Sequence, residues 1–118
     1  MVIADTSVWV AHLRAGQPGL KELLHNTQVF RHDFVIGELA CGNLKNRREI
    51  MHLLESLPPA PLLSQEEVLY FIERHSLMGT GIGFVDAHLL ASAQLSGAFL
   101  WTLDNNLRRA AVRLELSY

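Results

Sequence analysis

Two short apolar segments of this sequence each run directly into an aspartate and then into a segment with helical spacing. Residues 1–5 read MVIAD, and residues 98–104 read AFLWTLD. Short apolar runs of this kind are typical of buried strands, and their alternation with helical segments predicts an α/β fold with a mainly parallel sheet. Functional residues of such sheets gather beyond the carboxyl ends of the strands, so Asp5 and Asp104 are expected at the same edge.

Local signals place the other elements along the chain. Asp33 is the expected N-cap of a helix that Gly42 ends, and Ser64 and Glu67 have the spacing of a capping box. Residues 79–83, GTGIG, lack the spacing of a phosphate-binding loop and are interpreted as a flexible loop. Helices are predicted over 6–14, 18–26, 33–42, 46–57, 64–77, 85–97 and 104–114, and further short strands over 28–32 and 115–118.

The composition describes a single domain spanning residues 1–118. With 49% hydrophobic residues, a chain of this length can fill one sizeable core. Cys41 is the only cysteine, which excludes an internal disulfide and a zinc site built mainly from thiolates. The N-terminal segment lacks the basic region of a signal peptide, and no apolar stretch approaches the roughly 20 residues of a membrane span. We therefore expect a cytoplasmic protein without a membrane segment.

Two further acids, Glu38 and Asp86, lie on inward-facing stripes of predicted helices. Glu38 follows Val35 on its stripe, and Asp86 precedes Leu90. Together with the two acids at the strand ends, they would form one acidic pocket. Like charges this close raise one another's pKa unless a cation neutralises them, and an all-oxygen site suits Mg²⁺ or Mn²⁺.

Each acid also has an ordinary structural interpretation. Asp5 and Asp104 could serve only as N-caps, Asp86 could complement a helix dipole at the edge of the core, and Glu38 could be a partly exposed helical residue. The joint pattern favours the pocket over four separate explanations. The six histidines form no metal-binding motif and are interpreted as surface or packed residues.

The distribution of charge leaves room for a nucleic-acid partner. The formal net charge is −2, and setting aside the four carboxylates leaves +2 on the rest of the chain. Basic residues group within 43–48 and 108–113. These groups are either solvated helix faces or phosphate contacts. The candidates for phosphate contacts are Lys45, Arg47, Arg48, Arg108 and Arg109.

In order and spacing, the segments VIADTSVWV, GELACG, FVDAHLLASAQL and LWTLDNNL resemble the acidic motifs of PIN-domain ribonucleases, above all the VapC-type toxins of toxin–antitoxin modules. The resemblance implies a three-layer α/β/α sandwich and a Mg²⁺- or Mn²⁺-dependent endoribonuclease. Its catalytic set would be Asp5, Glu38, Asp86 and Asp104, with Asp5 and Asp86 as direct metal ligands and the other two binding directly or through water.

The same resemblance implies supporting residues and partners. Thr6 and Thr102 match hydroxyl positions that would orient the acids or a bound phosphate. The expected partners are an RNA substrate, a second copy of the chain in a homodimer, and a cognate VapB-like antitoxin that covers the active site. Gly37, before Glu38, and the NNL sequence after Asp104 depart from the family pattern.

Two other interpretations remain open from the sequence. One is a different metal-dependent phosphoryl-transfer enzyme with Asp5 as the nucleophile, although such enzymes usually carry a second acid two residues later, where this chain has Ser7. The other is a non-catalytic RNA- or protein-binding module with the same fold. A binding module would not need a repulsive acidic pocket, which favours the nuclease.

Overall fold

A three-stranded parallel sheet lies at the centre of the chain, in the strand order β2–β1–β3. The computed structural model describes all 118 residues, with β1 at Val2–Ala4, β2 at Val29–Phe30 and β3 at Phe99–Trp101. Both pairings of β1 are parallel, as predicted. The predicted strand over 115–118 is reduced to one bridge, between Leu100 and Ser117.

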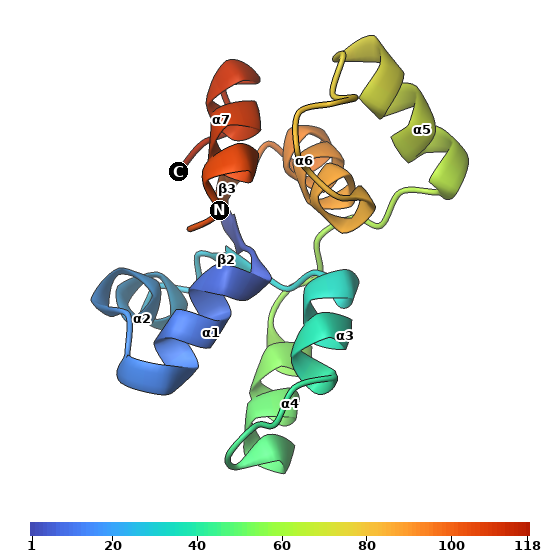
Figure 1. The fold of residues 1–118 in the computed structure, drawn as a ribbon. Coiled ribbons are helices and arrows are strands. Elements are labelled where there is room, and N and C mark those ends of the chain that lie inside the picture. The colour runs from blue at the N-terminus through green and yellow to red at the C-terminus, as the bar shows by residue number, and fades with distance from the viewer.

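Helices surround this short sheet. Figure 1 shows α1 and α2 on one side of it and α5 and α6 on the other, while α3 and α4 lie side by side. This arrangement is the predicted sandwich, with the sheet as its middle layer. The helices are α1 (Thr6–Ala15), α2 (Pro18–His25), α3 (Asp33–Ala40), α4 (Arg47–Ser56), α5 (Gln65–Arg74), α6 (Phe84–Ser96) and α7 (Asn105–Arg113).

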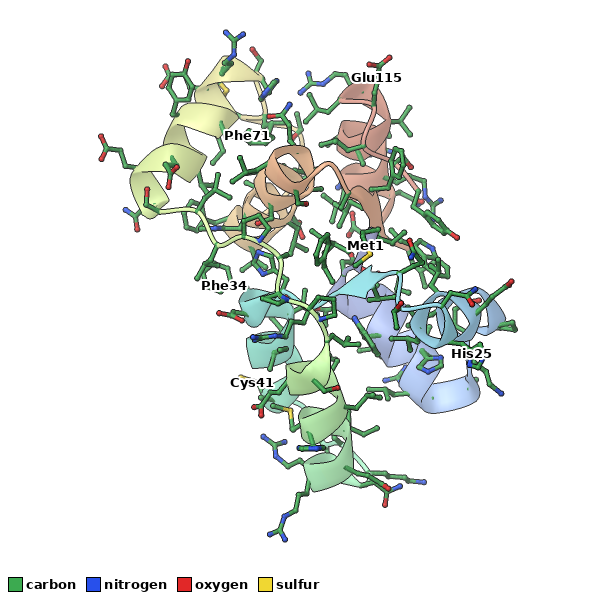
Figure 2. All side chains as sticks on the ribbon, turned by 180° about the vertical axis from the view of Figure 1, so that it is seen from behind. Met1, His25, Phe34, Cys41, Phe71 and Glu115 are labelled. Carbon is green, nitrogen blue, oxygen red and sulfur yellow. The ribbon has the colours of Figure 1, made fainter.

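Helix α6 is the central helix of the core and packs against both β1 and β3. Its residues 87–93 are all buried, and several of them are small, so the helix can lie close to the sheet. On its other side it contacts α5, from which Phe71 points toward it in Figure 2. The left-handed Gly97 ends the helix, as the sequence predicts. This packing fixes the start of α6, and with it Asp86, relative to the strand ends.

The N-cap of α3 is His32 and not Asp33, so that prediction is wrong. The His32 ring is buried, and its Nδ1 accepts a hydrogen bond from the Phe34 N–H at 3.1 Å. Its Nε2 lies 3.1 Å from the Ser92 hydroxyl on α6, and that hydroxyl donates to the Pro61 carbonyl at 2.7 Å. Asp33 instead forms a surface ion pair with Arg31. The imidazole caps α3 because the same ring also ties that helix to α6.

An aromatic contact reinforces this junction of α3 and α6. In Figure 2, Phe34 lies at the end of α3 nearer α6, and Cys41 lies at the opposite end. The Phe34 ring meets the buried His88 ring of α6 edge-on, with centroids 4.6 Å apart. The histidines that reach the core are therefore packing residues, as predicted, and they hold the helix that carries Glu38 against the helix that carries Asp86.

The buried His32 predicts a loss of stability in mild acid. Burial, and secondarily the nearby His88, lower the pKa of His32 from 6.5 to about 4, with Asp33 opposing them weakly. The unfolded chain then binds this proton more readily than the native state. The contribution of His32 to stability is complete above pH 6.5 and is lost as the pH falls toward 4. Denaturant titrations should show a loss of at most about 2 kcal/mol between pH 7.5 and pH 5.

The matched variant is His32→Asn, whose side-chain oxygen can still cap α3 but does not titrate in this range. Its free energy of unfolding should be lower than that of the wild type at pH 7.5 but should depend less on pH. An unchanged pH dependence in His32→Asn would show that other groups cause the acid sensitivity.

Candidate active site

Asp5 is a buried carboxylate at the carboxyl end of β1, only 5% exposed. Its Oδ1 accepts hydrogen bonds from the Ser7 hydroxyl at 2.5 Å and from the Val8 N–H at 3.2 Å, so it does cap α1. Its Oδ2 accepts a hydrogen bond from the Thr102 hydroxyl, which follows β3. A buried charge is tolerated when such bonds hold it. Asp5 therefore caps α1 with one carboxylate oxygen while the other oxygen bonds to Thr102.

Asp104 lies at the same edge of the sheet, beyond the end of β3. Its Oδ1 accepts from the Leu107 N–H at 2.9 Å and so caps α7, as predicted. Its own N–H donates to the Thr102 hydroxyl at 3.0 Å. Thr102 thus links the two strand-end acids, because the same hydroxyl donates to Asp5 and accepts from the Asp104 backbone.

Glu38 reaches this edge from the exposed side of α3. Its Oε1 accepts a hydrogen bond from the Thr6 hydroxyl of α1 at 2.7 Å. The residue is exposed, although its predicted stripe neighbour Val35 is buried. Thr6 therefore orients an acid, as the resemblance implied, and the acid is Glu38.

Asp86 is partly buried in the first turn of α6. Its Oδ2 accepts a hydrogen bond from the Gly83 N–H at 3.0 Å. Burial raises its pKa above 3.8, the Gly83 bond opposes that rise, and the charges of Asp104, Asp5 and Glu38 raise it further. The three other acids therefore lie near enough to Asp86 for their charges to oppose its ionisation. We call this group of four the acidic site.

The donor chemistry of the acidic site fits a divalent cation that prefers oxygen. All four side chains supply carboxylates, and the repulsion acting on Asp86 is the kind that a bound cation removes. Glu38, Asp86 and Asp104 each use one carboxylate oxygen in a hydrogen bond within the protein. No three acidic, histidine or cysteine side chains converge tightly enough to form a coordination group. Binding would therefore require side-chain rotation toward a common centre.

The predicted basic residues divide into structural and unengaged side chains. Arg47 donates to the Ala40 carbonyl at 2.5 Å and the Gly42 carbonyl at 3.2 Å, and so covers the end of α3. Arg108 donates to the Thr102 carbonyl at 3.0 Å, close to the acidic site. Arg109 bonds to the side chain of Asn106. The two predicted cations that form no side-chain hydrogen bond or ion pair are Lys45 and Arg48.

Two residues that the sequence analysis did not assign to the site also support it. The Ser7 hydroxyl donates to Asp5 and accepts from the Leu103 N–H at 3.0 Å, which gives the two strand ends a second link. The Asn106 amide of α7 donates to the Gly81 carbonyl at 3.4 Å. Gly81 has a φ of +83°, and a Cβ there would lie 2.5 Å from the Asn106 amide nitrogen. The Gly-rich loop before Asp86 is therefore fastened to α7.

The comparisons with known proteins place this α/β fold and its acidic edge in a family. The family model described as "PIN domain" matches residues 2–113, and the chain belongs to the PIN domain family. Within that family, it is 45% identical over 111 residues to "Ribonuclease VapC32" of Mycobacterium tuberculosis, from strains CDC 1551 / Oshkosh and ATCC 25618 / H37Rv. Each match covers 93% of this chain and 90% of the relative.

A solved structure independently supports the fold. The crystal structure of PAE2754 from Pyrobaculum aerophilum superposes with a TM-score of 0.64 and 19% identity, covering 97% of this chain and 88% of that one. At this identity, the likeness concerns the fold alone. Within the chain, no helix combines the length and the apolar character needed to cross a membrane.

Proposed function

We propose that this chain is an endoribonuclease toxin of a VapBC-like toxin–antitoxin system, and that the acidic site hydrolyses RNA phosphodiester bonds with the help of Mg²⁺ or Mn²⁺. The similarity to a protein named as a VapC ribonuclease supports the activity. The observation that ties the proposal to particular residues is the Thr102 hydroxyl that joins Asp5 to Asp104 at one sheet edge. The pKa of Asp86 agrees with it, since burial raises that pKa and the charges of Asp104, Asp5 and Glu38 raise it further. Repulsion of this kind at Asp86 is what a bound cation would relieve.

We assign different roles to the residues of the acidic site according to their burial and hydrogen bonding. Asp5 is the most firmly held, and with Asp86 it would provide the direct ligands to the cation. Glu38 and Asp104 are exposed and would bind directly, through water, or position the attacking water. Thr6 orients Glu38, and Thr102 orients Asp5. When bound, the cation would activate water and stabilise negative charge on the phosphoryl oxygens.

The basic side chains without a partner in the protein would bind the RNA substrate. Lys45 and Arg48 would bind phosphates of the RNA, with Arg47, Arg108 and Arg109 contributing beside their structural bonds. Attack by water in line with the 3′-oxygen leaves 5′-phosphate and 3′-hydroxyl ends. We further propose a cytoplasmic homodimer silenced by a VapB-like antitoxin that covers the acidic site, in keeping with the name of the relative.

Metal removal tests this function directly. Purified chain, freed of any antitoxin, should cleave RNA in Mg²⁺ or Mn²⁺ and lose that activity in EDTA, with recovery when the metal is restored. An Asp86→Asn preparation, purified in the same way, controls for contaminating ribonucleases. Cleavage that persists in EDTA would contradict the metal-dependent mechanism. Absence of cleavage with either metal, in folded protein, would favour the non-catalytic binding module.

A further inference from the structure

We propose that a cleft between α1, α3 and α4 binds a nucleotide that flanks the scissile phosphate and so sets sequence preference. The inference rests on the proposed nuclease function. The cleft has a volume of about 550 Å³, and Thr6 and Glu38 line it at one end. These two residues also belong to the acidic site or its support, through the 2.7 Å bond between them. The cleft is therefore continuous with the acidic site. We call it the nucleotide cleft.

One stripe of α1 forms a wall of the cleft that leads away from the acidic site. Thr6, Val10, Leu13 and Arg14 all line it, and their spacing places them on one face of the helix. The eight-residue separation of Thr6 and Arg14 corresponds to about 12 Å along the axis. Successive phosphates of a stacked strand advance by about 3.4 Å, so the wall is long enough for more than one nucleotide.

The apolar part of the cleft lining is aliphatic. It consists of Val10, Leu13, Leu39, Leu44 and Ile50, of which Leu39 is fully buried and the others are partly buried. Apolar walls with a few polar groups are the usual composition of a site for an organic ring. A nucleobase fits this composition, since its faces are apolar and its edges are polar.

The rim carries positive charge that has no partner within the protein. Arg14 and Lys45 both line the cleft, and neither forms an ion pair, because the only ion pair in the chain joins Arg31 and Asp33. The only carboxylate in the lining is Glu38, at the end that meets the acidic site. The lining of the cleft is thus negative at Glu38, beside the acidic site, and positive at Arg14 and Lys45. Such cations are suited to a phosphate that flanks the scissile one.

Two amides provide polar groups that can read a base edge. Asn43 and Asn46 line the cleft. Asn46 occupies the N-cap position of α4, where asparagine usually bonds to the helix, yet its side chain makes no capping bond. Its φ of +53° directs the chain through a left-handed turn. An asparagine amide can both donate to and accept from a base, which gives the cleft a means of discrimination.

The test compares cleavage of oligoribonucleotides whose positions beside the scissile bond are randomised. The double variant Arg14→Ala with Lys45→Ala should raise KM about tenfold, leave kcat within about twofold, and reduce the salt slope by about one unit per removed charge. Asn43→Ala and Asn46→Gly should flatten the nucleotide preference, and glycine retains the left-handed backbone at position 46. The matched control is Arg74→Ala on α5, an exposed arginine outside the cleft, which should change none of these values.

Two outcomes overturn the assignment of the cleft. One is a double variant with wild-type KM, salt slope and nucleotide preference. The other is a variant that binds RNA normally but no longer binds the cognate antitoxin, which would assign the cleft to a peptide.

Failure of the nuclease proposal is recognised separately. If the wild type cleaves no RNA, the affinity of a fluorescent single-stranded oligoribonucleotide is measured by anisotropy, with and without the double substitution. Weaker binding by the double variant supports the nucleotide cleft although the nuclease has failed, and equal binding overturns the cleft as well.

Discussion

Replacing Asp86 by asparagine should abolish RNA cleavage while leaving the fold as stable as before, or more stable. Asparagine keeps an oxygen that can accept the Gly83 N–H, so the first turn of α6 is retained. It removes the negative charge that the acidic site would offer to a cation. We expect a loss of about 10²–10⁴-fold in cleavage rate at neutral pH, measured with a defined oligoribonucleotide in Mg²⁺.

The Asp86→Asn variant should lose activity, but its stability should stay the same or increase. The pKa of Asp86 is raised above 3.8 by burial and by the other acids, so ionisation of Asp86 destabilises the native state. This penalty is absent at pH values well below 3.8, where the group is protonated in both states. It grows as the pH rises through the raised pKa and is constant above it. The thermal midpoint of Asp86→Asn at pH 7, without metal, should therefore equal or exceed that of the wild type. A clear decrease would mean that the charge of Asp86 is needed for folding.

The position of the strand-end acids is what the sequence predicts best. Asp5 and Asp104 follow apolar runs that had to be parallel strands, and topology then placed them at one edge. The alternation of short strands and helices likewise predicts the parallel sheet, and the resemblance to PIN-domain ribonucleases implies the sandwich layers. The sequence pattern could not predict the length of each strand, because the ends of a strand depend on pairing with neighbours that are distant in sequence. The predicted strand over 28–32, for example, is a strand only at Val29–Phe30, with a single further bridge between Arg31 and Pro59.

The side-chain links inside the site were less accessible to sequence reasoning. Ser7 counted only as evidence against a phosphatase, yet its hydroxyl joins Asp5 to the Leu103 backbone, 96 residues away. The resemblance pointed to Thr6 and Thr102 but not to the acid that each would hold. Such bonds depend on how β1 and β3 lie beside each other, and local spacing does not encode that.

Charged residues on helices were the hardest to interpret. Glu38 is exposed at the site, although its position on an apolar stripe suggested an inward orientation. Arg47 is a candidate for a phosphate contact by sequence, and in the structure it also donates to carbonyls at the end of α3. Asp33 is an ordinary capping residue by type, but the neighbouring His32 takes the cap because its ring also bonds to Ser92. In each case a tertiary contact overrides the local preference.

These contacts give the acidic site two kinds of support. Its buried acid, Asp5, is held across the parallel sheet by a hydrogen bond from the buried Thr102 hydroxyl. Its exposed half, Glu38 and Asp104, is held by a single side-chain bond each, from Thr6 and from the Leu107 N–H. The buried bond between Thr102 and Asp5 should therefore tolerate change least, because removal of a partner there leaves polar groups that water cannot reach. The largest effect is expected for substitution of Thr102.

Replacing Thr102 by valine preserves the shape of the side chain but removes the hydroxyl that joins Asp5 to Asp104. The buried Asp5 carboxylate loses a donor and the Asp104 N–H loses its acceptor, so unfolding should become easier by about 1–3 kcal/mol. Cleavage should fall about 10–100-fold, because outer groups of this kind orient the ligands of a metal. Denaturant unfolding and cleavage rates over a range of Mg²⁺ concentrations measure the two effects.

The metal titration distinguishes a positioning role from a loss of folded protein. A misdirected Asp5 should raise the Mg²⁺ concentration needed for half-maximal cleavage by the folded Thr102→Val variant, whereas partial unfolding would lower the maximal rate without moving that midpoint. Thr102→Ser restores the hydroxyl and should recover most of both properties. Thr80→Val is the matched control, because its hydroxyl donates only to the Leu77 carbonyl within its own turn. An unchanged Mg²⁺ midpoint in Thr102→Val would show that Thr102 stabilises the strand ends without positioning a ligand.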